Sequence, residues 1–478
     1  MLFHSFFFLF VFLPLTIIGW HFLSAFKNRA VSEWFLIVMS LWFYALFGKE
    51  VLALLLICTA LGFLFHRLLW LARSAMQMRI LLAASTVIYL LILFWYKLHD
   101  GVLPVGLSFY LFQMIAFLAE RAKGNLADIS PREYLLYVFY FPKLAQGPIA
   151  LPAEIIEQFR TRERKHIDYE RILRGLMLFI FGLAKKVLLA DALSPVVNFG
   201  FAQTAYLDTA TILLVLFSYA FQLYFDFSGY CDMAMGISRM LGVELPVNFD
   251  APFQAQNLRD FWKRWHMTLS RFLTRYVYIP LGGSRRGQMF TYFNILLVFV
   301  LSGLWHGTGA TYLLWGLING LFVAVSHGLA KREKKKPQPE GSGKSRLFAR
   351  VRVFAAFLFT LVFFRSESVK MAFVMLRRFL LPLYPGFLLR TAANLNLSEL
   401  YPVTKALSFL LPGMENQVLL VFWILILILC FILIRKKNAY EIAATAPLTM
   451  KRALGMGVLF AWSMLAFNNV NSFLYFAY

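Results

Sequence analysis

The sequence is poor in charged residues, and acidic residues are the scarcest. Of its 478 residues only 15% are charged, whereas 60% are hydrophobic and 18% are aromatic. A soluble protein of this length needs far more charge to cover its surface, so the composition excludes that class. The apolar residues occur in runs of about 17–25, the length that crosses a bilayer core as a helix. The sequence therefore predicts an all-α, polytopic integral membrane protein.

Cysteine is rare as well. Cys58, Cys231 and Cys430 are the only three cysteines, and they lie far apart in the chain. This spacing excludes a disulfide framework and a CxxC metal motif. We interpret the three as small apolar residues that fill space in the core.

Lysine and arginine outnumber the acidic residues by 47 to 24, which gives a formal net charge of +23. In a soluble protein this excess indicates nucleic-acid binding, but no basic segment here belongs to a soluble nucleic-acid-binding fold. In membrane proteins Lys and Arg gather in loops on the cytoplasmic side. We therefore expect membrane lipid, and not nucleic acid, as the partner of these charges.

The positions of the basic residues predict the topology. Residues 1–478 are expected to form a single membrane domain of about twelve spans, with both termini outside. The charged run Lys331–Arg346, rich in Pro, Gly and Ser, is expected to be a flexible cytoplasmic loop. Short amphipathic helices are expected outside, within 366–416. The expected spans lie near residues 5–24, 31–47, 51–70, 80–96, 103–119, 173–191, 208–227, 289–306, 309–330, 350–364, 417–434 and 453–472.

Two segments are expected to be re-entrant. Pro142, Gly147 and Pro148 interrupt the apolar segment 134–152, and basic residues flank it on both sides. The arginine-bearing stretch 228–288 is expected to lie inside and to be partly re-entrant. Broken backbone at membrane depth is tolerated only where protein or a cavity buries it, so the first segment indicates a nearby site.

His306 is the one imidazole in the apolar stretch Leu297–Gly320. Ionisable residues inside a membrane are costly and mark functional sites by default, although a hydrogen-bonded tie between two helices is the alternative. Gly303, Gly307 and Gly309 flank it and permit close approach of a backbone or a ligand. His is also the commonest general base, so this position predicts proton transfer.

His266 lies where basic and aromatic residues alternate, near Lys263, Arg264 and Arg271. Two interpretations stay open. The segment is an interfacial helix with tryptophans in the aromatic belt and arginines on lipid headgroups, or it is a cationic mouth for a phosphate-bearing donor. In either case we expect His266 on the cytoplasmic side, one membrane crossing from His306.

A third cluster holds Asp226, Ser228 and Asp232, with Gly229 expected to break the helix. The two aspartates lie six residues apart with no histidine nearby, which argues against a metal site. They are expected to pair with arginine in a buried polar network or to cap broken helices. No G-x-S-x-G elbow surrounds Ser228, so a serine nucleophile is a weak interpretation.

These motifs, taken in order, resemble one known family. LPVGLSFYLFQMIAFLAE, FPKLAQGPI, YFDFSGYCDMAMG, NFDAPF, FWKRWHMTLSRFL, YIPLGG and GLWHG resemble the membrane-bound O-acyltransferase (MBOAT) family. The wording is most similar to the bacterial branch that O-acetylates alginate, cellulose and peptidoglycan. The resemblance covers nearly the whole chain and is strongest over residues 100–320.

The resemblance implies a ring of transmembrane and re-entrant helices around a central tunnel. It implies that His306 is catalytic and that His266 lines the path on the cytoplasmic side, and we expect both histidines to be catalytic residues. It also implies acetyl-CoA as the donor with no bound cofactor, a bacterial inner-membrane location, and a separate extracytoplasmic esterase-like (SGNH) transferase as partner. Together with the basic cluster, the residues expected to bind donor or substrate are Lys263, Arg264, Arg271, Trp305, Asp226, Ser228 and Asn257.

The expected function is therefore transfer of acetyl groups across the membrane for O-acetylation of an extracytoplasmic polysaccharide, such as alginate, another exopolysaccharide or peptidoglycan. One alternative is D-alanyl transfer to a cell-wall polymer from a carrier-protein thioester. The other is a proton-coupled flippase for a glycan or lipid, with His266 and His306 as proton relays. Many transporters contain internal repeats, and the sequence shows no convincing one, which favours the enzyme.

Overall fold

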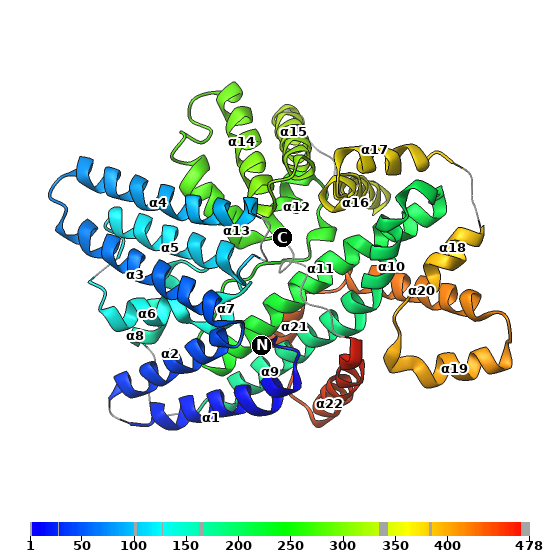
Figure 1. The fold of residues 1–478 in the computed structure, drawn as a ribbon, viewed down its shortest axis with the longest axis horizontal. Helices are drawn as coiled ribbons and strands as arrows, with labels where there is room; N and C mark the ends of the chain where they lie inside the picture. Colours follow the sequence, from blue (N-terminus) through cyan, green and yellow to red (C-terminus); the bar gives the residue numbers. More distant parts are fainter. Residues whose placement is uncertain are drawn as a thin grey trace.

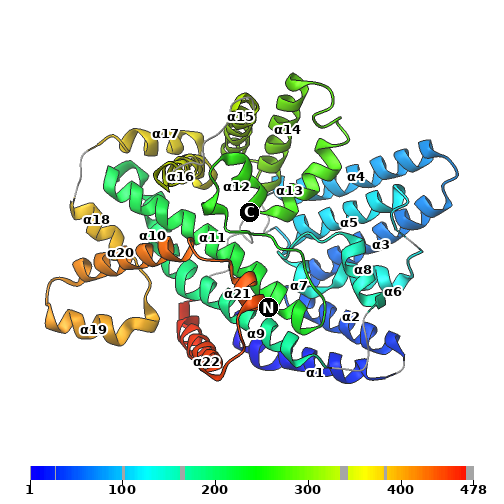
Figure 2. The ribbon, with the colours of Figure 1, turned by 180° about the vertical axis from the view of Figure 1, so that it is seen from behind.

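The computed structural model describes residues 2–26, 28–99, 103–126, 128–161, 167–333, 343–381 and 385–469. Within these ranges every regular element is a helix, as predicted. The long helix α11 (Thr209–Met240) crosses the centre of the molecule, and helices from both halves of the chain surround it (Figure 1). The view from behind shows the same arrangement (Figure 2). Most of the expected cytoplasmic loop, residues 334–342, lies outside the described residues.

Seven helices in the described part of the chain are long and apolar enough to cross a membrane. They confirm a multi-pass membrane protein, and each coincides with an expected span. The helices are α3 (Lys49–Leu71), α4 (Ala75–Leu98), α11 (Thr209–Met240), α14 (Gln288–His306), α15 (Ala310–Glu333), α16 (Gly343–Arg365) and α20 (Glu415–Leu433).

The other five expected spans coincide with shorter helices, so the span count of about twelve stays a prediction. These are η1 (Phe8–Phe12) with α1 (Leu13–Ser24), α2 (Arg29–Ala45), α5 (Leu107–Ala122), α9 (Tyr169–Ala184) and α22 (Met450–Leu465). The short helices expected within 366–416 are present. Outside the two broken segments, the remaining helices are η2 (Lys185–Ala190), α10 (Asp191–Ala202), η3 (Thr204–Tyr206), α17 (Val369–Arg378), α18 (Pro385–Ala392), η6 (Ser398–Leu400), α19 (Tyr401–Leu410), α21 (Ala439–Thr445) and η7 (Ala466–Asn469).

The segment 134–152 is broken, as its prolines and glycine predict. It contains α6 (Pro131–Phe139) and the single turn α7 (Phe141–Leu144), followed by non-helical backbone up to α8 (Pro152–Thr161). Every residue from 136 to 150 is buried. Side chains satisfy part of this backbone: the Tyr137 hydroxyl donates to the Ala150 carbonyl at 3.0 Å. Burial inside protein is what permits irregular backbone at such a depth.

The prediction for the start of 228–288 is wrong. Gly229 does not break the helix, because α11 continues without interruption to Met240. A Cβ atom at Gly229 would lie 2.7 Å from the carbonyl oxygen of Gly182 in α9, and one at Gly236 would lie 2.6 Å from that of Gly175. The glycines therefore serve close packing of two helices, as small residues do in membranes.

The rest of the stretch is broken, as expected. After α11 the chain forms η4 (Pro252–Gln254), α12 (Leu258–Arg264), α13 (Met267–Leu273) and η5 (Thr274–Tyr278) before α14 begins. In both views α12 and α13 lie between α11 and the pair α14–α15 (Figures 1 and 2). This placement brings His266, which precedes α13, close to His306, the last residue of α14.

We predict that Gly229→Ala destabilises the protein by about 1–3 kcal/mol, because the added methyl group forces apart two packed helix backbones. The measurement is thermal unfolding in detergent or nanodiscs. Gly455→Ala in α22 is the matched control, since a Cβ atom there meets nothing within 4 Å. A Gly229→Ala protein that melts at or above the parental temperature would contradict the packing account.

Candidate active site

A cavity of about 700 Å³ lies between the broken segment α12–α13–η5 and the helix pair α14–α15. Both His266 and His306 line it. Its wall also carries aromatic rings, hydroxyl groups and four cationic side chains. These further lining residues are Arg259, Trp262, Lys263, Thr268, Ser270, Arg271, Arg275, Ser302 and Trp315.

His306 is the last residue of α14 and is buried. Its ring packs edge-on against Trp315, with ring centroids 5.4 Å apart, and against Phe364 at 5.0 Å. The Lys97 ammonium, from the end of α4, donates a hydrogen bond of 3.1 Å to the His306 carbonyl. A cation at this position also complements the negative end of the α14 dipole. Lys97 was not anticipated from the sequence, because it lies in the last turn of α4, 209 residues before His306.

Two of the three glycines near His306, Gly303 and Gly307, allow α15 to approach α14 closely. A Cβ atom at Gly303 would clash with the carbonyl oxygen of Tyr312 in α15, and one at Gly307 would clash with the Tyr312 ring. At Gly309 the nearest atom would be 3.6 Å away, which is an ordinary contact. The first two glycines therefore let α15 pack directly on the end of α14, next to the imidazole.

His266 immediately precedes α13 and has a left-handed backbone conformation, with φ 45° and ψ 53°. Only Ala251 shares a positive φ among the described non-glycine residues. Such conformations persist where the surrounding structure enforces them, and they gather at functional sites. The ring is buried, and its Nδ1 lies 3.2 Å from Oδ1 of Asn248.

The expected distance between the two histidines is wrong. They were placed one membrane crossing apart, but the Trp305 ring contacts both, at 5.9 Å from His266 and 4.8 Å from His306. The reason is that the chain after α11 folds back along that helix, which brings His266 to within 4.7 Å of the Phe227 ring. Both imidazoles therefore belong to one site.

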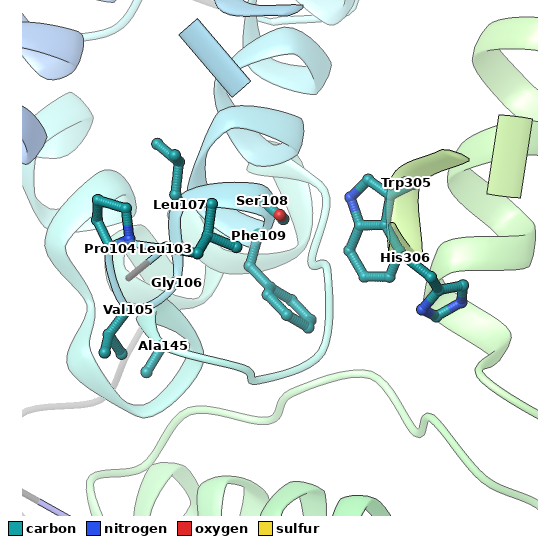
Figure 3. Close-up of a pocket in the computed structure, with 10 residues that line it drawn as sticks. All are labelled: Leu103, Pro104, Val105, Gly106, Leu107, Ser108, Phe109, Ala145, Trp305 and His306. Carbon is teal, nitrogen blue, oxygen red and sulfur yellow. The ribbon is translucent and has the colours of Figure 1, made fainter. Parts of the chain in front are cut away.

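A second, much smaller pocket of about 20 Å³ lies at the start of α5 and is bordered by Trp305 and His306. Ser108 and Phe109 project from α5 toward Trp305, and His306 lies beside Trp305 on the facing helix (Figure 3). Gly106, with φ 77°, allows the turn that begins α5. His306 thus borders two spaces, a large cation-lined cavity and a small pocket at α5.

The structure divides the predicted cations into two groups. Lys263 and Arg271 line the large cavity, whereas Arg264 is not among the lining residues. Instead Arg264 pairs with Asp260 at 2.9 Å and with Asp250 at 3.4 Å. The Asp260 contact is an i,i+4 pair within one helix, whereas the Asp250 contact has no local sequence signal, because Asp250 belongs to a separate loop.

Two of the lining cations are neutralised by carboxylates. Arg271 donates to Glu154 at 2.8 Å, and Arg275 donates to Glu120 at 2.8 Å. Hydrogen bonding to that carboxylate raises the pKa of Arg275. Lys263 and Arg259 form no ion pair within the described part of the chain, and the buried Nε of Arg259 has no hydrogen-bond partner there. Arg259 belongs to the basic surround of His266 in the sequence but was not among the residues predicted to bind the donor, although it lines the cavity.

The acidic cluster forms a buried network away from the cavity. The partners are lysines of η2 and not the expected arginines: Lys186 bridges Asp226 at 2.7 Å and Asp191 at 2.8 Å. Lys185 pairs with Asp232 at 2.5 Å. A role as caps is excluded because both aspartates lie inside the continuous α11. Adjacent lysines at a π-helical turn are hard to assign as partners from sequence alone.

Besides Arg264, four predicted binding residues do not line the large cavity: Trp305 borders the small pocket instead, and the other three lie elsewhere. Asp226 is held in the lysine network, and Ser228 is buried within α11. Asn257 caps α12 by accepting a hydrogen bond of 3.0 Å from the Asp260 backbone N–H. None of the three is among the residues that line the cavity. The described residues also contain no cluster of three or more ligands for a metal ion.

The fold and the site define a multi-pass membrane protein with two buried histidines in one cavity. Over residues 36–364 the chain matches the MBOAT, membrane-bound O-acyltransferase family, and it belongs to that family. This confirms the resemblance carried by the sequence motifs and identifies the protein as an O-acyltransferase.

Similar proteins act on polymers of the cell envelope or cell surface. The chain is 32% identical over 425 residues to a peptidoglycan O-acetyltransferase of Helicobacter pylori, covering 79% of each chain. It is 33% identical over 384 residues to a probable alginate O-acetylase AlgI of Pseudomonas fluorescens, covering 78% of this chain and 74% of the relative. A teichoic acid D-alanyltransferase of Bacillus subtilis is 26% identical over 245 residues, covering 50% of this chain and 62% of the relative.

Proposed function

We propose that the protein transfers acetyl groups from acetyl-CoA, which enters the large cavity from the cytoplasmic side, to a hydroxyl group on the other side of the membrane. The final acceptor is an extracytoplasmic polysaccharide such as peptidoglycan or an alginate-like polymer. The observation that carries the proposal is the position of His306, which borders both the cation-lined cavity and the small pocket at α5. The names of the relatives with the higher identities support acetyl as the group transferred.

The chemistry requires a base at the point where donor and acceptor meet. The hydroxyl oxygen attacks the thioester carbonyl carbon, so a C–O bond forms and the C–S bond breaks. The hydroxyl proton passes to the neutral His306 imidazole and from there to the departing thiolate, which leaves as free CoA. A hydroxyl is a weak nucleophile at neutral pH, and a positioned general base accelerates such a transfer by about 10²–10⁴.

The cavity supports a phosphate-bearing donor through the cations that carry no carboxylate partner. Among the described residues Lys263 and Arg259 are the two such cations at its wall, and ammonium and guanidinium groups pair well with phosphate oxygens. Arg271 and Arg275 are already paired with Glu154 and Glu120, so they offer less net charge. The acetyl end of the donor would then point toward His306, away from these cations.

We propose that the protein lies in a bacterial inner membrane, with lipid around its exposed apolar helices. A separate extracytoplasmic esterase-like transferase is proposed to pass the acetyl group to the polymer. D-alanyl transfer is the second candidate, supported by the teichoic acid relative. That relative covers half of this chain at lower identity, so we favour acetyl transfer.

We predict that His306→Ala lowers acetyl transfer by about 10²–10⁴ while the protein folds normally, because the general base is lost. The measurement is transfer from radiolabelled acetyl-CoA by purified protein, at matched amounts and after comparison of melting temperatures. His99→Ala is the control, since His99 is exposed and stacks on Trp95 outside the site. A well-folded His306→Ala protein with near-parental transfer would reduce His306 to a packing residue.

We also predict that Lys263→Ala combined with Arg259→Gln raises the KM for acetyl-CoA about tenfold or more and weakens its dependence on salt. The physical reason is loss of two charge-assisted contacts to phosphate. Arg264→Gln is the matched control, because Arg264 lies on the same helix but pairs with aspartates outside the cavity. If the double variant keeps the parental KM, or if Arg264→Gln raises KM equally, the basic cluster contacts lipid headgroups and not the donor.

A further inference from the structure

We infer that Asn248 fixes His266 as the tautomer that carries its proton on Nδ1, which leaves Nε2 as a hydrogen-bond and proton acceptor. Asn248 is therefore a positioning residue that acts through His266. The tautomer follows from the hydrogen-bond network alone. Only its effect on acyl transfer rests on the proposed function.

The side chain of Asn248 is fully buried in the loop that follows α11. Its Oδ1 atom lies at the centre of three contacts. The His266 Nδ1 is 3.2 Å away, the Thr268 backbone nitrogen is 3.1 Å away, and the Thr268 hydroxyl is 2.9 Å away. The Asn248 carbonyl also accepts a hydrogen bond of 2.9 Å from the Met267 backbone N–H. The asparagine thus binds the start of α13 through both its side chain and its backbone.

The orientation of the Asn248 amide follows from donors whose role is fixed. A backbone N–H can only donate, so the Asn248 atom that faces the Thr268 nitrogen is the carbonyl oxygen. The amide nitrogen then faces Sγ of Cys231, at 3.3 Å, where a weak sulfur acceptor is available. In the flipped orientation the amide nitrogen would face the Thr268 backbone N–H, so the hydrogen bond from Thr268 and the contact with Sγ of Cys231 would both be lost.

The Thr268 hydroxyl agrees with this orientation. It accepts a hydrogen bond of 3.1 Å from the backbone N–H of Ile149, in the broken segment after α7. Its own proton is therefore free to point at Oδ1 of Asn248, which accepts it. Every donor and acceptor around the amide then has a consistent partner.

The state of His266 follows. Since Oδ1 has no proton to give, the His266 nitrogen that faces it must carry one, and in a neutral imidazole the other nitrogen is then the acceptor. Nε2 points away from Asn248, on a ring that lines the large cavity. Besides His266, the charged and titratable groups at that cavity are Arg259, Lys263, Arg271, Arg275, Tyr278 and His306, and Cys231 contacts the Asn248 amide nitrogen. Neighbouring positive charge disfavours a second proton on the ring.

A neutral His266 with this tautomer accepts a hydrogen bond from an N–H or O–H group in the cavity and cannot donate one through Nε2. In the proposed reaction this selects how the bound donor is oriented, because an acceptor group placed at Nε2 would be repelled. Loss of Asn248 leaves the ring free to exchange tautomers and to turn. That loss weakens donor orientation without removing His266 itself.

The direct test is a ¹⁵N spectrum of protein labelled at histidine, in nanodiscs near neutral pH, with His266→Gln used to assign the signal. The parent is expected to show neutral His266 with its proton on Nδ1. Cys231→Ala is the matched control, since it leaves all Oδ1 contacts in place and should keep that tautomer. Asn248→Ala should give a tautomer mixture. A parental His266 protonated on Nε2 or on both nitrogens, or an Asn248→Ala signal identical to the parent, would overturn the inference.

The kinetic test separates positioning from general instability. Asn248→Ala is expected to raise the KM for acetyl-CoA about tenfold, the equivalent of one hydrogen bond, with a smaller change in kcat. Asn248→Asp keeps the acceptor oxygens and the shape of the side chain, but its negative charge favours the imidazolium form. The acid limb of kcat/KM should therefore move to higher pH in Asn248→Asp, and an unmoved limb would overturn the kinetic role.

The spectra need no enzymatic activity, so they decide the tautomer even if the parent transfers no acetyl group. An inactive parent with the expected tautomer would count against the proposed function only. If Asn248→Ala does not fold, the Asn248→Asp and Cys231→Ala proteins still give opposite expectations for the His266 signal, imidazolium against neutral Nδ1–H.

Discussion

The constraint on which the rest of the structure depends is that irregular backbone at membrane depth must be buried in protein, because lipid offers no hydrogen bonds. Residues 145–150 meet this constraint because all of them are buried, and the broken stretch 241–287 packs against them. The contact from the Ile149 N–H to the Thr268 hydroxyl joins them directly. The cavity that holds His266 and His306 lies where the second segment faces α14 and α15.

Close helix packing makes room for this arrangement. Gly182 and Gly229 let the backbones of α9 and α11 pack in direct contact. Gly303 and Gly307 do the same for α14 and α15 at the level of His306. Small residues are the usual means of helix association in lipid, where apolar side chains gain little by leaving their surroundings. The two histidines are thus held by helix contacts on one side and by a hydrogen-bond network on the other.

The sequence predicted the membrane class, the positions of nearly all long helices and the broken segment 134–152. It also singled out the two histidines that line the large cavity. These features depend on local composition and on single residues that are costly in lipid. It failed where the answer depends on a partner far along the chain. Gly229 was taken as a break because its partner Gly182 lies in another helix, and the histidines were placed apart because the fold-back of 241–287 leaves no local signal.

The same limit applies to charge and to tautomers. Arg264 and Arg259 look alike in sequence. In the structure Arg264 pairs with two aspartates, whereas Arg259 lines the cavity and forms no ion pair with any described residue. Asn248 carries no pattern that distinguishes it from other polar residues in a loop. Its role emerges only from the simultaneous positions of His266 and Thr268. Motif resemblance pointed to two histidines that line one cavity in the structure, and the geometry shows which residues contact them.

The proposed function requires donor and acceptor to meet at His306, in the cavity that His266 also lines. Cryo-electron microscopy of the protein in nanodiscs, saturated with a non-hydrolysable acetyl-CoA analogue, tests it most directly. We expect density for the analogue in the large cavity, with its phosphates beside Arg259 and Lys263 and its acetyl group next to His306. Density for the analogue at another place on the protein, with the cavity between α12–α13 and α14–α15 empty, would contradict the account.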